Sequence, residues 1–78
     1  MARLRLFAQA RESAGTSEAT VEGSTLGEVL DAAAERYGPH FAAVLATSAV
    51  WINGDPADRD TLVGEGDEVA VLPPVSGG

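Results

Sequence analysis

Residues 25–39 read TLGEVLDAAAERYGP, and this stretch decides the fold class of the chain. Thr25 followed three residues later by Glu28 forms a capping box, the pattern that begins an α-helix. Apolar side chains then recur at helical spacing, and acidic side chains fall on the opposite face. The Gly-Pro pair that follows suits the end of a helix. The stretch therefore predicts an amphipathic helix over residues 25–37.

Two short strands are predicted before this helix. Residues 2–8 (ARLRLFA) alternate between apolar and polar, which is typical of a half-buried strand. Phe7 falls on the same face as the two arginines, an unusual place for an aromatic side chain. Residues 17–22 predict the second strand, and the polar segment 9–16 contains a glycine, which favours a loop. The pair is therefore expected to form a hairpin with a long loop.

After the helix, apolar residues at 41, 44 and 45 predict a short extra helical turn. Residues 49–53 and 69–72 are apolar and β-branched, so both are expected to be strands. Between them, residues 58–68 are acidic and glycine-rich and are expected to be mostly loop. The order β-β-α-β-β, with the first and last strands adjacent, predicts an α+β roll. The expected core comprises Leu4, Leu6, Val21, Leu26, Val29, Leu30, Ala33, Tyr37, Val44, Leu45, Trp51, Leu62, Val69 and Val71.

Composition excludes several classes of protein. The chain has 78 residues, which is enough for one small domain, and a net charge of −7. Its five basic residues are all arginines, so neither nucleic acid nor an anionic membrane is an expected partner. It has no cysteine, which fits the reducing cytoplasm and excludes disulfides and thiolate sites. Residues 1–9 have no apolar core, so no signal peptide is expected.

Groups that could perform catalysis are sparse. His40 is the only histidine, and no serine lies in a nucleophile motif. Asp55, Asp58 and Asp60 lack the glycine and terminal glutamate of a calcium loop. Without lysine there is no P-loop. We therefore expect no metal site and no bound cofactor.

The last residues, Pro73-Pro74-Val75-Ser76-Gly77-Gly78, carry the most specific signal. The prolines stiffen the start of this segment, and the glycines leave little bulk beside a terminal carboxylate. A carboxylate is ionised at neutral pH, so it must be activated before it can react. The chain has no nucleotide-binding motif, so another protein would have to supply ATP. We expect residues 1–74 to form the folded domain and residues 75–78 to form a flexible, reactive tail.

With these features the chain resembles the ubiquitin-like β-grasp sulfur carriers, the MoaD/ThiS group. Within that group it is most similar to the family of molybdopterin synthase small subunits. The motifs that carry the resemblance are residues 7–12 (FAQARE) with Gly15, and residues 66–70 (GDEVA) leading into the Pro-Pro and Gly-Gly ending. The resemblance covers the whole chain, with specific matches at its two ends.

The resemblance implies a sulfur-carrying cycle. An adenylyltransferase of the ubiquitin-activating type would adenylate Gly78 with MgATP, and a sulfurtransferase step would convert it to a thiocarboxylate. Pro74, Val75, Ser76 and Gly77 would thread into the large subunit of the synthase. There the sulfur would attack cyclic pyranopterin monophosphate. The chain would then be a non-catalytic, sulfur-donating subunit that binds no cofactor itself.

The resemblance also implies an apolar docking patch on the sheet. Phe7 matches the aromatic of the family's first strand, and Arg11 matches an arginine near the same surface. Leu72 lies where the family commonly has an aromatic, and Pro56 lies where it often has an aliphatic residue. These four residues form the expected partner-binding patch, which is less aromatic than usual.

Three other functions fit the same sequence. The chain could carry sulfur for thiamin thiazole or cysteine synthesis. It could instead be a ubiquitin-like modifier joined to target proteins through Gly78, although the lack of lysine excludes lysine-linked chains of itself. Finally, it could be a passive binding module in which the terminal glycines have no role.

Overall fold

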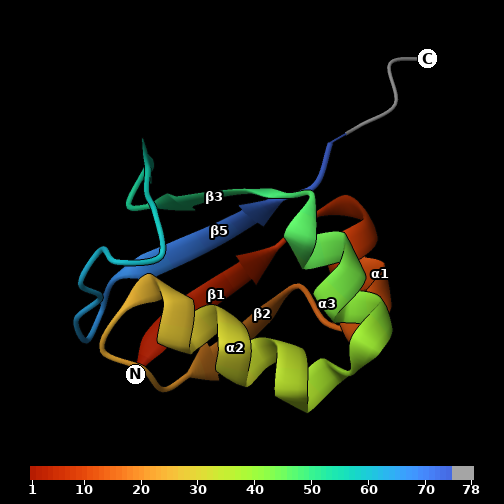
Figure 1. The fold of residues 1–78 in the computed structure, drawn as a ribbon, viewed down its shortest axis with the longest axis horizontal. Coiled ribbons are helices and arrows are strands. Elements are labelled where there is room, and N and C mark those ends of the chain that lie inside the picture. The colour runs from red at the N-terminus through yellow and green to blue at the C-terminus, as the bar shows by residue number, and fades with distance from the viewer. Residues whose placement is uncertain (75–78) are drawn as a thin grey trace.

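The computed structural model of the chain describes residues 1–74, so the predictions for residues 75–78 lie outside the described part. The elements in chain order are β1 (Ala2–Leu6), α1 (Ala8–Ala14), β2 (Glu18–Val21), α2 (Leu26–Tyr37), α3 (Pro39–Ala46), β3 (Ala49–Ile52), β4 (Asp55–Pro56) and β5 (Glu68–Leu72). The strands form one mixed sheet in the order β2-β1-β5-β3-β4. The helices lie on one face of this sheet and leave the other face open (Figure 1).

The first and last strands are adjacent and parallel at the centre of the sheet, as predicted. Leu4 is level with Val69, and Leu6 is level with Val71. On either side, β2 pairs with β1 and β3 pairs with β5, both antiparallel. Every second residue of the central strands therefore points into the helix layer, and the residues between them point to the open face. This arrangement confirms the predicted α+β roll.

Helix α2 begins as its capping box predicts. The Thr25 hydroxyl accepts a hydrogen bond from the Glu28 amide at 3.2 Å. The Glu28 carboxylate reaches back to the amide of Ser24, at 2.8 Å, one residue earlier than in the standard box. One amide that the first turn of the helix leaves unpaired, that of Glu28, is thus satisfied, together with the amide of Ser24 just before the helix. At the other end, Gly38 adopts φ 96° and donates its amide to the carbonyl of Ala34.

The loop predicted over residues 9–16 is wrong, because most of it is helix α1. Ala10 is fully buried and Ala14 packs partly buried against the core, while Gln9 and Glu12 are exposed, so two alanines attach this short helix. Gly15 ends it at φ 78°, donating its amide to the carbonyl of Arg11. The glycine assigned to a loop is in fact a helix C-cap. As a result β1 ends at Leu6, two residues earlier than predicted.

Two further elements were underestimated. The predicted helical turn after Pro39 is the eight-residue helix α3, with the proline in its first turn. Proline at that position loses no hydrogen bond, so it both follows α2 and starts α3. Strand β4 was not predicted. It pairs with β3 through a tight turn in which Asn53 and Gly54 have φ values of 51° and 86°. Two adjacent positive φ values are the pattern of a type I′ hairpin turn.

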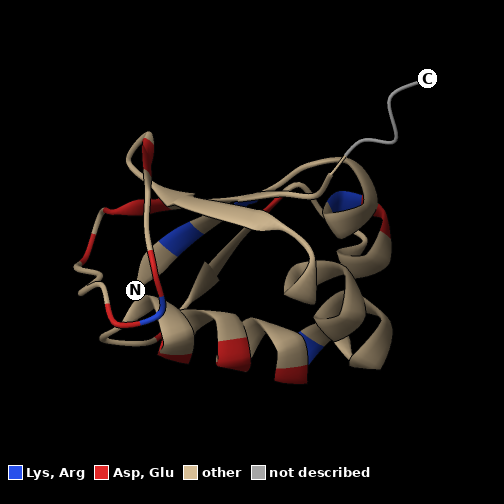
Figure 2. Ribbon diagram, turned by 45° about the horizontal axis from the view of Figure 1, so that its top comes forward, with Lys and Arg blue, Asp and Glu red and all other residues tan. Residues whose placement is uncertain are grey.

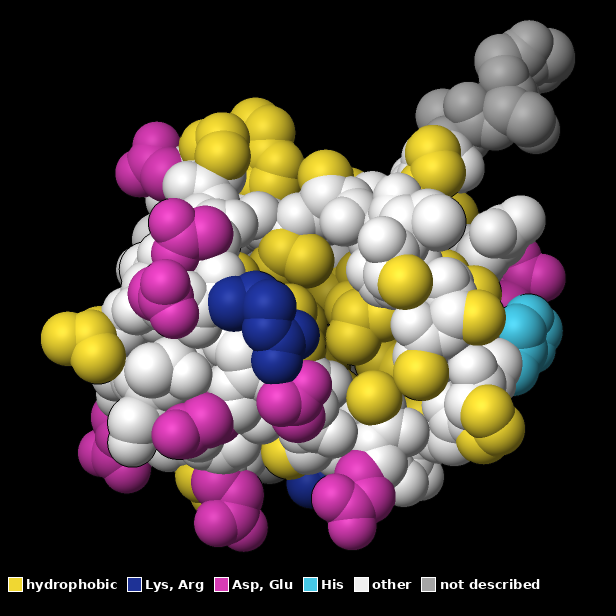
Figure 3. Space-filling model, in the orientation of Figure 1, with side chains coloured by type: hydrophobic (Ala, Val, Ile, Leu, Met, Phe, Trp, Pro, Cys, Tyr) yellow, Lys and Arg dark blue, Asp and Glu magenta, His cyan; other side chains and the backbone are white. Residues whose placement is uncertain are grey.

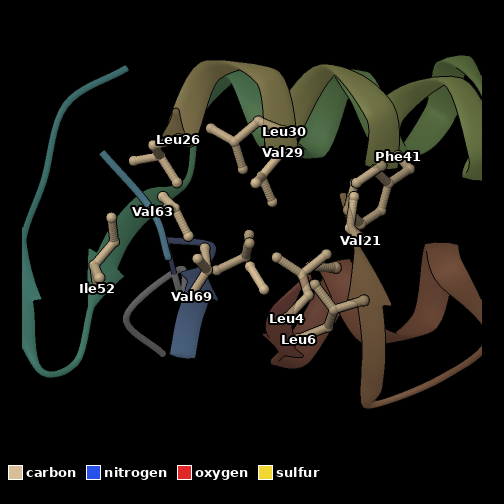
Figure 4. Packing of buried hydrophobic residues seen from close by; sticks show 14 of the residues in the cluster. Leu4, Leu6, Val21, Leu26, Val29, Leu30, Phe41, Ile52, Val63 and Val69 are labelled. Carbon is tan, nitrogen blue, oxygen red and sulfur yellow. The ribbon is translucent and has the colours of Figure 1, made fainter. Parts of the chain in front are cut away.

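The core lies between the sheet and the three helices. Ten of the predicted core residues are buried, and Tyr37 and Leu45 are partly buried against them. Figure 4 shows Phe41 reaching from α3 toward Val21 of β2. Phe41 is the largest fully buried side chain, yet it was missing from the predicted core. The other buried hydrophobic residues that the prediction omitted are Ala2, Ala10, Ile52 and Val63.

Two predicted core residues are on the surface. Leu62 is 76% exposed, and its neighbour Val63 is buried in its place. The Val63 amide donates to the carbonyl of Ser24, which fixes the loop so that the second of the two apolar residues faces inward. Trp51 is 37% exposed because it lies at an outward position of β3. It shares this side of the strand with the exposed Ala49, whereas the next residue, Ile52, faces inward.

Candidate functional site

The open face of the sheet is the surface next to the point where the chain leaves the fold. Strand pairing places its side chains in rows that run across the strands. The row nearest the end of β5 contains Leu72 and, level with it on β3, Ala49. Phe7 directly follows Leu6, which is level with Val71, so Phe7 stands beside Leu72 on the other side. This row is entirely apolar. We call it the exit row, because Pro73 and Pro74 follow directly from it.

The second row, one pleat further from the end of β5, mixes apolar and charged groups. Arg5 of β1 is level with Ala70 of β5, and Ala70 is level with Trp51 of β3. Trp51 in turn is level with Pro56 of β4. On β2, Glu18 is level with Arg5, so the row is apolar over β5, β3 and β4 and charged over β1 and β2. Phe7 and Trp51, 40% and 37% exposed, are the two aromatic side chains of this face.

The third row is charged: Arg3 of β1 is level with Glu68 of β5. The Glu68 carboxylate lies 3.4 Å from the guanidinium of Arg3 and 3.7 Å from that of Arg5 in the second row. The Arg5 guanidinium also lies over the Phe7 ring, 5.8 Å from its centroid. Exposed ion pairs of this kind add little stability, so their main effect is to orient the arginines. Figure 2 shows basic residues on β1, whereas acidic residues follow α2 and the segment before β5.

The Gly66-Asp67-Glu68 motif has a structural role. The Asp67 carboxylate accepts hydrogen bonds from the Gly64 amide at 2.8 Å and from the Asn53 side-chain amide at 3.0 Å. The Asn53 side-chain oxygen accepts from the Glu68 amide at 2.9 Å. These bonds join the turn after β3 to the start of β5. They lower the pKa of Asp67 below 3.8, mainly through the backbone amide of Gly64 and secondly through Asn53.

The Asp67 network predicts a loss of stability in acid. A carboxyl with a lowered pKa in the folded state stabilises the fold above its unfolded pKa, and this stabilisation disappears as the pH falls through the folded pKa. We expect the urea midpoint of the native chain to fall more steeply than that of Asp67→Asn between about pH 5 and about pH 2. Asp60→Asn is the matched control, and it should follow the native curve. Identical pH slopes for Asp67→Asn and the native chain would contradict this role.

The structure brings three of the predicted docking residues onto one face. Phe7, Leu72 and Pro56 lie on the open face, in the exit row and the second row. Arg11 is exposed on α1, one helical turn after Phe7. Pro73 is buried and Pro74 is exposed, so the chain leaves the fold at Pro74. The remaining predicted site residues, Val75, Ser76, Gly77 and Gly78, lie outside the described residues.

Trp51 is a residue of this face that sequence reasoning assigned to the core. Side chains alternate along β3, so once Ile52 is known to face inward, Ala49 and Trp51 must lie on the opposite side. This alternation is the signal that places Trp51 correctly, provided that one inward-facing residue is known. An apolar run of four residues does not show which alternate positions face the core.

A hollow lies on the helix side of the sheet, and Figure 3 shows it as a patch of hydrophobic side chains beside basic ones. Its volume is about 500 Å³, and α2, α3 and the segment around Ala57 surround it. Arg59 closes one side through two hydrogen bonds to the Asp31 carboxylate, at 2.9 and 2.8 Å. The Ser48 hydroxyl at its edge donates to the Val44 carbonyl. Its polar groups therefore already have partners within the fold.

The described residues hold no group of three side chains that could bind a metal ion. His40 is exposed and lines a hollow with Gln9, Glu12 and Ser13. No helix within residues 1–74 is long and apolar enough to cross a membrane.

Comparisons with known proteins agree with this fold. The model of the ThiS family matches residues 4–78. A molybdopterin synthase sulfur carrier subunit from Chlamydomonas reinhardtii is 38% identical, over 92% of this chain and 92% of its own length. The solution structure of small archaeal modifier protein 1 from Methanosarcina acetivorans has a TM-score of 0.88 at 30% identity, over 99% of this chain and 95% of the other.

A third similar structure is the complex of subunits 1 and 2 of the molybdopterin-converting factor from Helicobacter pylori. The matching chain has a TM-score of 0.72 at 24% identity, over 99% of this chain and 97% of the other, and shows the shared fold. The family match spans both the strands of the open face and the Gly-Gly ending. On this ground the chain belongs to the ThiS family, and its relatives include molybdopterin synthase sulfur carrier subunits.

Proposed function

We propose that this chain carries sulfur as a thiocarboxylate on Gly78 and delivers it to cyclic pyranopterin monophosphate in molybdenum cofactor synthesis. The observation that carries this proposal is the apolar exit row leading into the Pro73-Pro74 segment, in a chain whose relatives are named as sulfur carrier subunits of molybdopterin synthase. An apolar surface suited to docking thus lies beside Pro74, where the segment that ends in Gly77-Gly78 begins.

The loading chemistry needs an activating partner. A Gly78 carboxylate oxygen attacks the α-phosphorus of MgATP, and pyrophosphate leaves. The outer sulfur of a sulfurtransferase persulfide then attacks the acyl carbon, and AMP leaves with the oxygen atom. A second thiol cleaves the resulting acyl disulfide, which releases the thiocarboxylate and leaves a disulfide on the sulfurtransferase side. Glycine leaves the acyl carbon unhindered, which favours both attacks. The chain has no lysine for a P-loop, so we assign ATP binding to an adenylyltransferase of the ubiquitin-activating type.

The delivery step needs a second partner that accepts the tail. We propose that Phe7, Leu72 and Pro56 dock against the large subunit of molybdopterin synthase, with Arg11 at the edge of the contact. The Helicobacter pylori complex of subunits 1 and 2 supports this choice, because its small chain shares the fold. Pro74, Val75, Ser76 and Gly77 would lead Gly78 into the partner's active site. We place both steps in the cytoplasm, as expected from the cysteine-free sequence.

A transfer assay tests this proposal without the activating enzyme. The chain is released from an intein fusion with sulfide, which leaves a thiocarboxylate on Gly78. It is then mixed with the large subunit of the same organism and with cyclic pyranopterin monophosphate. We expect molybdopterin to form while the chain returns to the carboxylate mass. A thiocarboxylated chain that keeps its sulfur in the presence of both would refute delivery to this precursor.

A second candidate function is covalent attachment to other proteins. It is favoured by the 30% identity and TM-score of 0.88 to small archaeal modifier protein 1. In that case the Gly78 adenylate would react with lysine amines of target proteins. Conjugates that contain this chain would then appear in cell extract with MgATP, as species heavier than either partner. A chain that gains sulfur and forms no conjugates favours the carrier.

A further inference from the structure

Trp51 is presented at the surface although it is the only tryptophan of the chain. The core contains smaller aliphatic groups and Phe41, while this larger side chain stays 37% exposed on the open face. Tryptophan exposes a large apolar area there, and such residues often mark binding surfaces. Its position on β3 is set by strand pairing, so no adjustable loop is involved.

The neighbours of Trp51 on the open face are mostly apolar. Ala70 is level with Trp51 on β5, and Ala49 lies two residues before it on β3. Phe7 stands on the far side of β5, beside Leu72. Two aromatic side chains therefore share this part of the face with small alanines. Arg5 lies on its β1 side, with its guanidinium 3.7 Å from the Glu68 carboxylate.

We infer that Trp51 is the main docking anchor of this chain for the large catalytic subunit that receives the sulfur. This inference rests on the proposed function. Leu72 and Pro56 leave the expected patch short of aromatic area, and Trp51 supplies that area from β3. The partner that we assign to it is the subunit that receives the sulfur. The chain leaves the fold at Pro74, directly after the exit row, and Trp51 lies one row away on the same face.

The same geometry defines what the partner offers. An aliphatic side chain would pack over Ala70, against Trp51 and Phe7. A carboxylate beside it would meet the Arg5 guanidinium, which is 45% exposed. This arginine lies in a chain of net charge −7, so a local basic group favours this orientation of an acidic partner group.

The first test compares matched alanine variants in binding and in turnover. Trp51→Ala should weaken binding to the large subunit about tenfold or more, as for a buried tryptophan anchor, measured by calorimetry. Leu62→Ala is the control, because Leu62 is more exposed but lies in the loop before β5, off the open face. It should stay close to the native affinity. With thiocarboxylated chains, Trp51→Ala should raise KM and leave kcat unchanged, because Gly78 still performs the chemistry. A Trp51→Ala chain with native affinity and KM would overturn the inference.

The second test uses the native sequence and so does not depend on how a variant folds. The chain is labelled with 5-fluorotryptophan, which gives a single fluorine resonance because there is one tryptophan. Adding the large subunit should shift or broaden this resonance in proportion to complex formed. An unchanged resonance in a complex confirmed by gel filtration overturns the inference. So does a shift that depends only on the concentration of the chain itself, since that would assign Trp51 to contacts between copies.

Failure of the proposed function has a separate signature. If the thiocarboxylated native chain binds the large subunit but does not convert the precursor, delivery of sulfur is refuted, while the fluorine result still decides the role of Trp51 in the complex. If conversion proceeds and Trp51→Ala behaves as native, sulfur delivery stands and the anchor is refuted.

Discussion

Deletion of Gly78 should abolish sulfur loading completely. In the proposed cycle activation occurs at the terminal carboxylate, and the deletion moves that carboxylate one residue back along the chain. The reacting carbon would then fall short of the partner's catalytic groups, and misplacement by a small distance is enough to lose most of the rate. Intact mass after incubation with the activating enzyme, MgATP and a sulfur donor measures the effect. The expected product is unmodified chain.

A second variant extends the chain by one alanine after Gly78. It keeps both glycines but converts the Gly78 carboxyl group into a peptide bond. It should also remain unloaded. Both variants should keep the native fold, because the buried hydrophobic core extends only from Ala2 to Val71. Circular dichroism and urea unfolding check this. Sulfur gained by the extended chain would show that the acceptor is not the Gly78 carboxylate.

Replacing Phe41 with alanine should cause the largest loss of stability in the chain. Phe41 is fully buried, and its ring lies 5.2 Å from that of Tyr37, centroid to centroid. Truncating a buried phenylalanine costs about 3–5 kcal/mol, from lost burial and from the cavity that remains. The whole stability of a small domain is about 5–15 kcal/mol, so a large part of the population should unfold. Urea unfolding at neutral pH measures the difference.

Leu62→Ala serves as the control for Phe41→Ala. Leu62 is 76% exposed, and surface truncations of this kind change the free energy of unfolding by about 0.5 kcal/mol or less. A comparable loss in the two variants would mean that Leu62 lies in the core, as its sequence pattern suggested, and would contradict the described packing of the segment before β5.

The fold could be predicted where a local pattern has one physical outcome. The capping box at Thr25 and the Gly38-Pro39 pair set the ends of α2 because their hydrogen bonds are local. Helix α1 could not be predicted in this way. It is short and polar, and only the buried Ala10 and the partly buried Ala14 pack it against the core. Contacts far apart in sequence decide such an element, and composition indicates a loop.

The site shows the same division. The tail motif can be identified from residue types alone, since its chemistry depends on glycine and a free carboxylate. Which side chains lie on the open face depends on strand register, because the register decides whether Trp51 or its neighbour Ile52 faces the core. The clear alternation over residues 2–8 predicts that Phe7 lies on the same face as the arginines, and Phe7 is indeed exposed. Trp51 was missed, because in the apolar run of β3 both faces look alike to a sequence pattern.

The most direct measurement is the intact mass of the native chain after incubation with host extract, MgATP and a sulfur donor, with fragmentation to locate any change. The predicted result is a product heavier by the difference between a sulfur and an oxygen atom, located at Gly78 and absent without ATP. An unmodified mass, in extract that loads a known carrier in parallel, would contradict sulfur carriage by this chain.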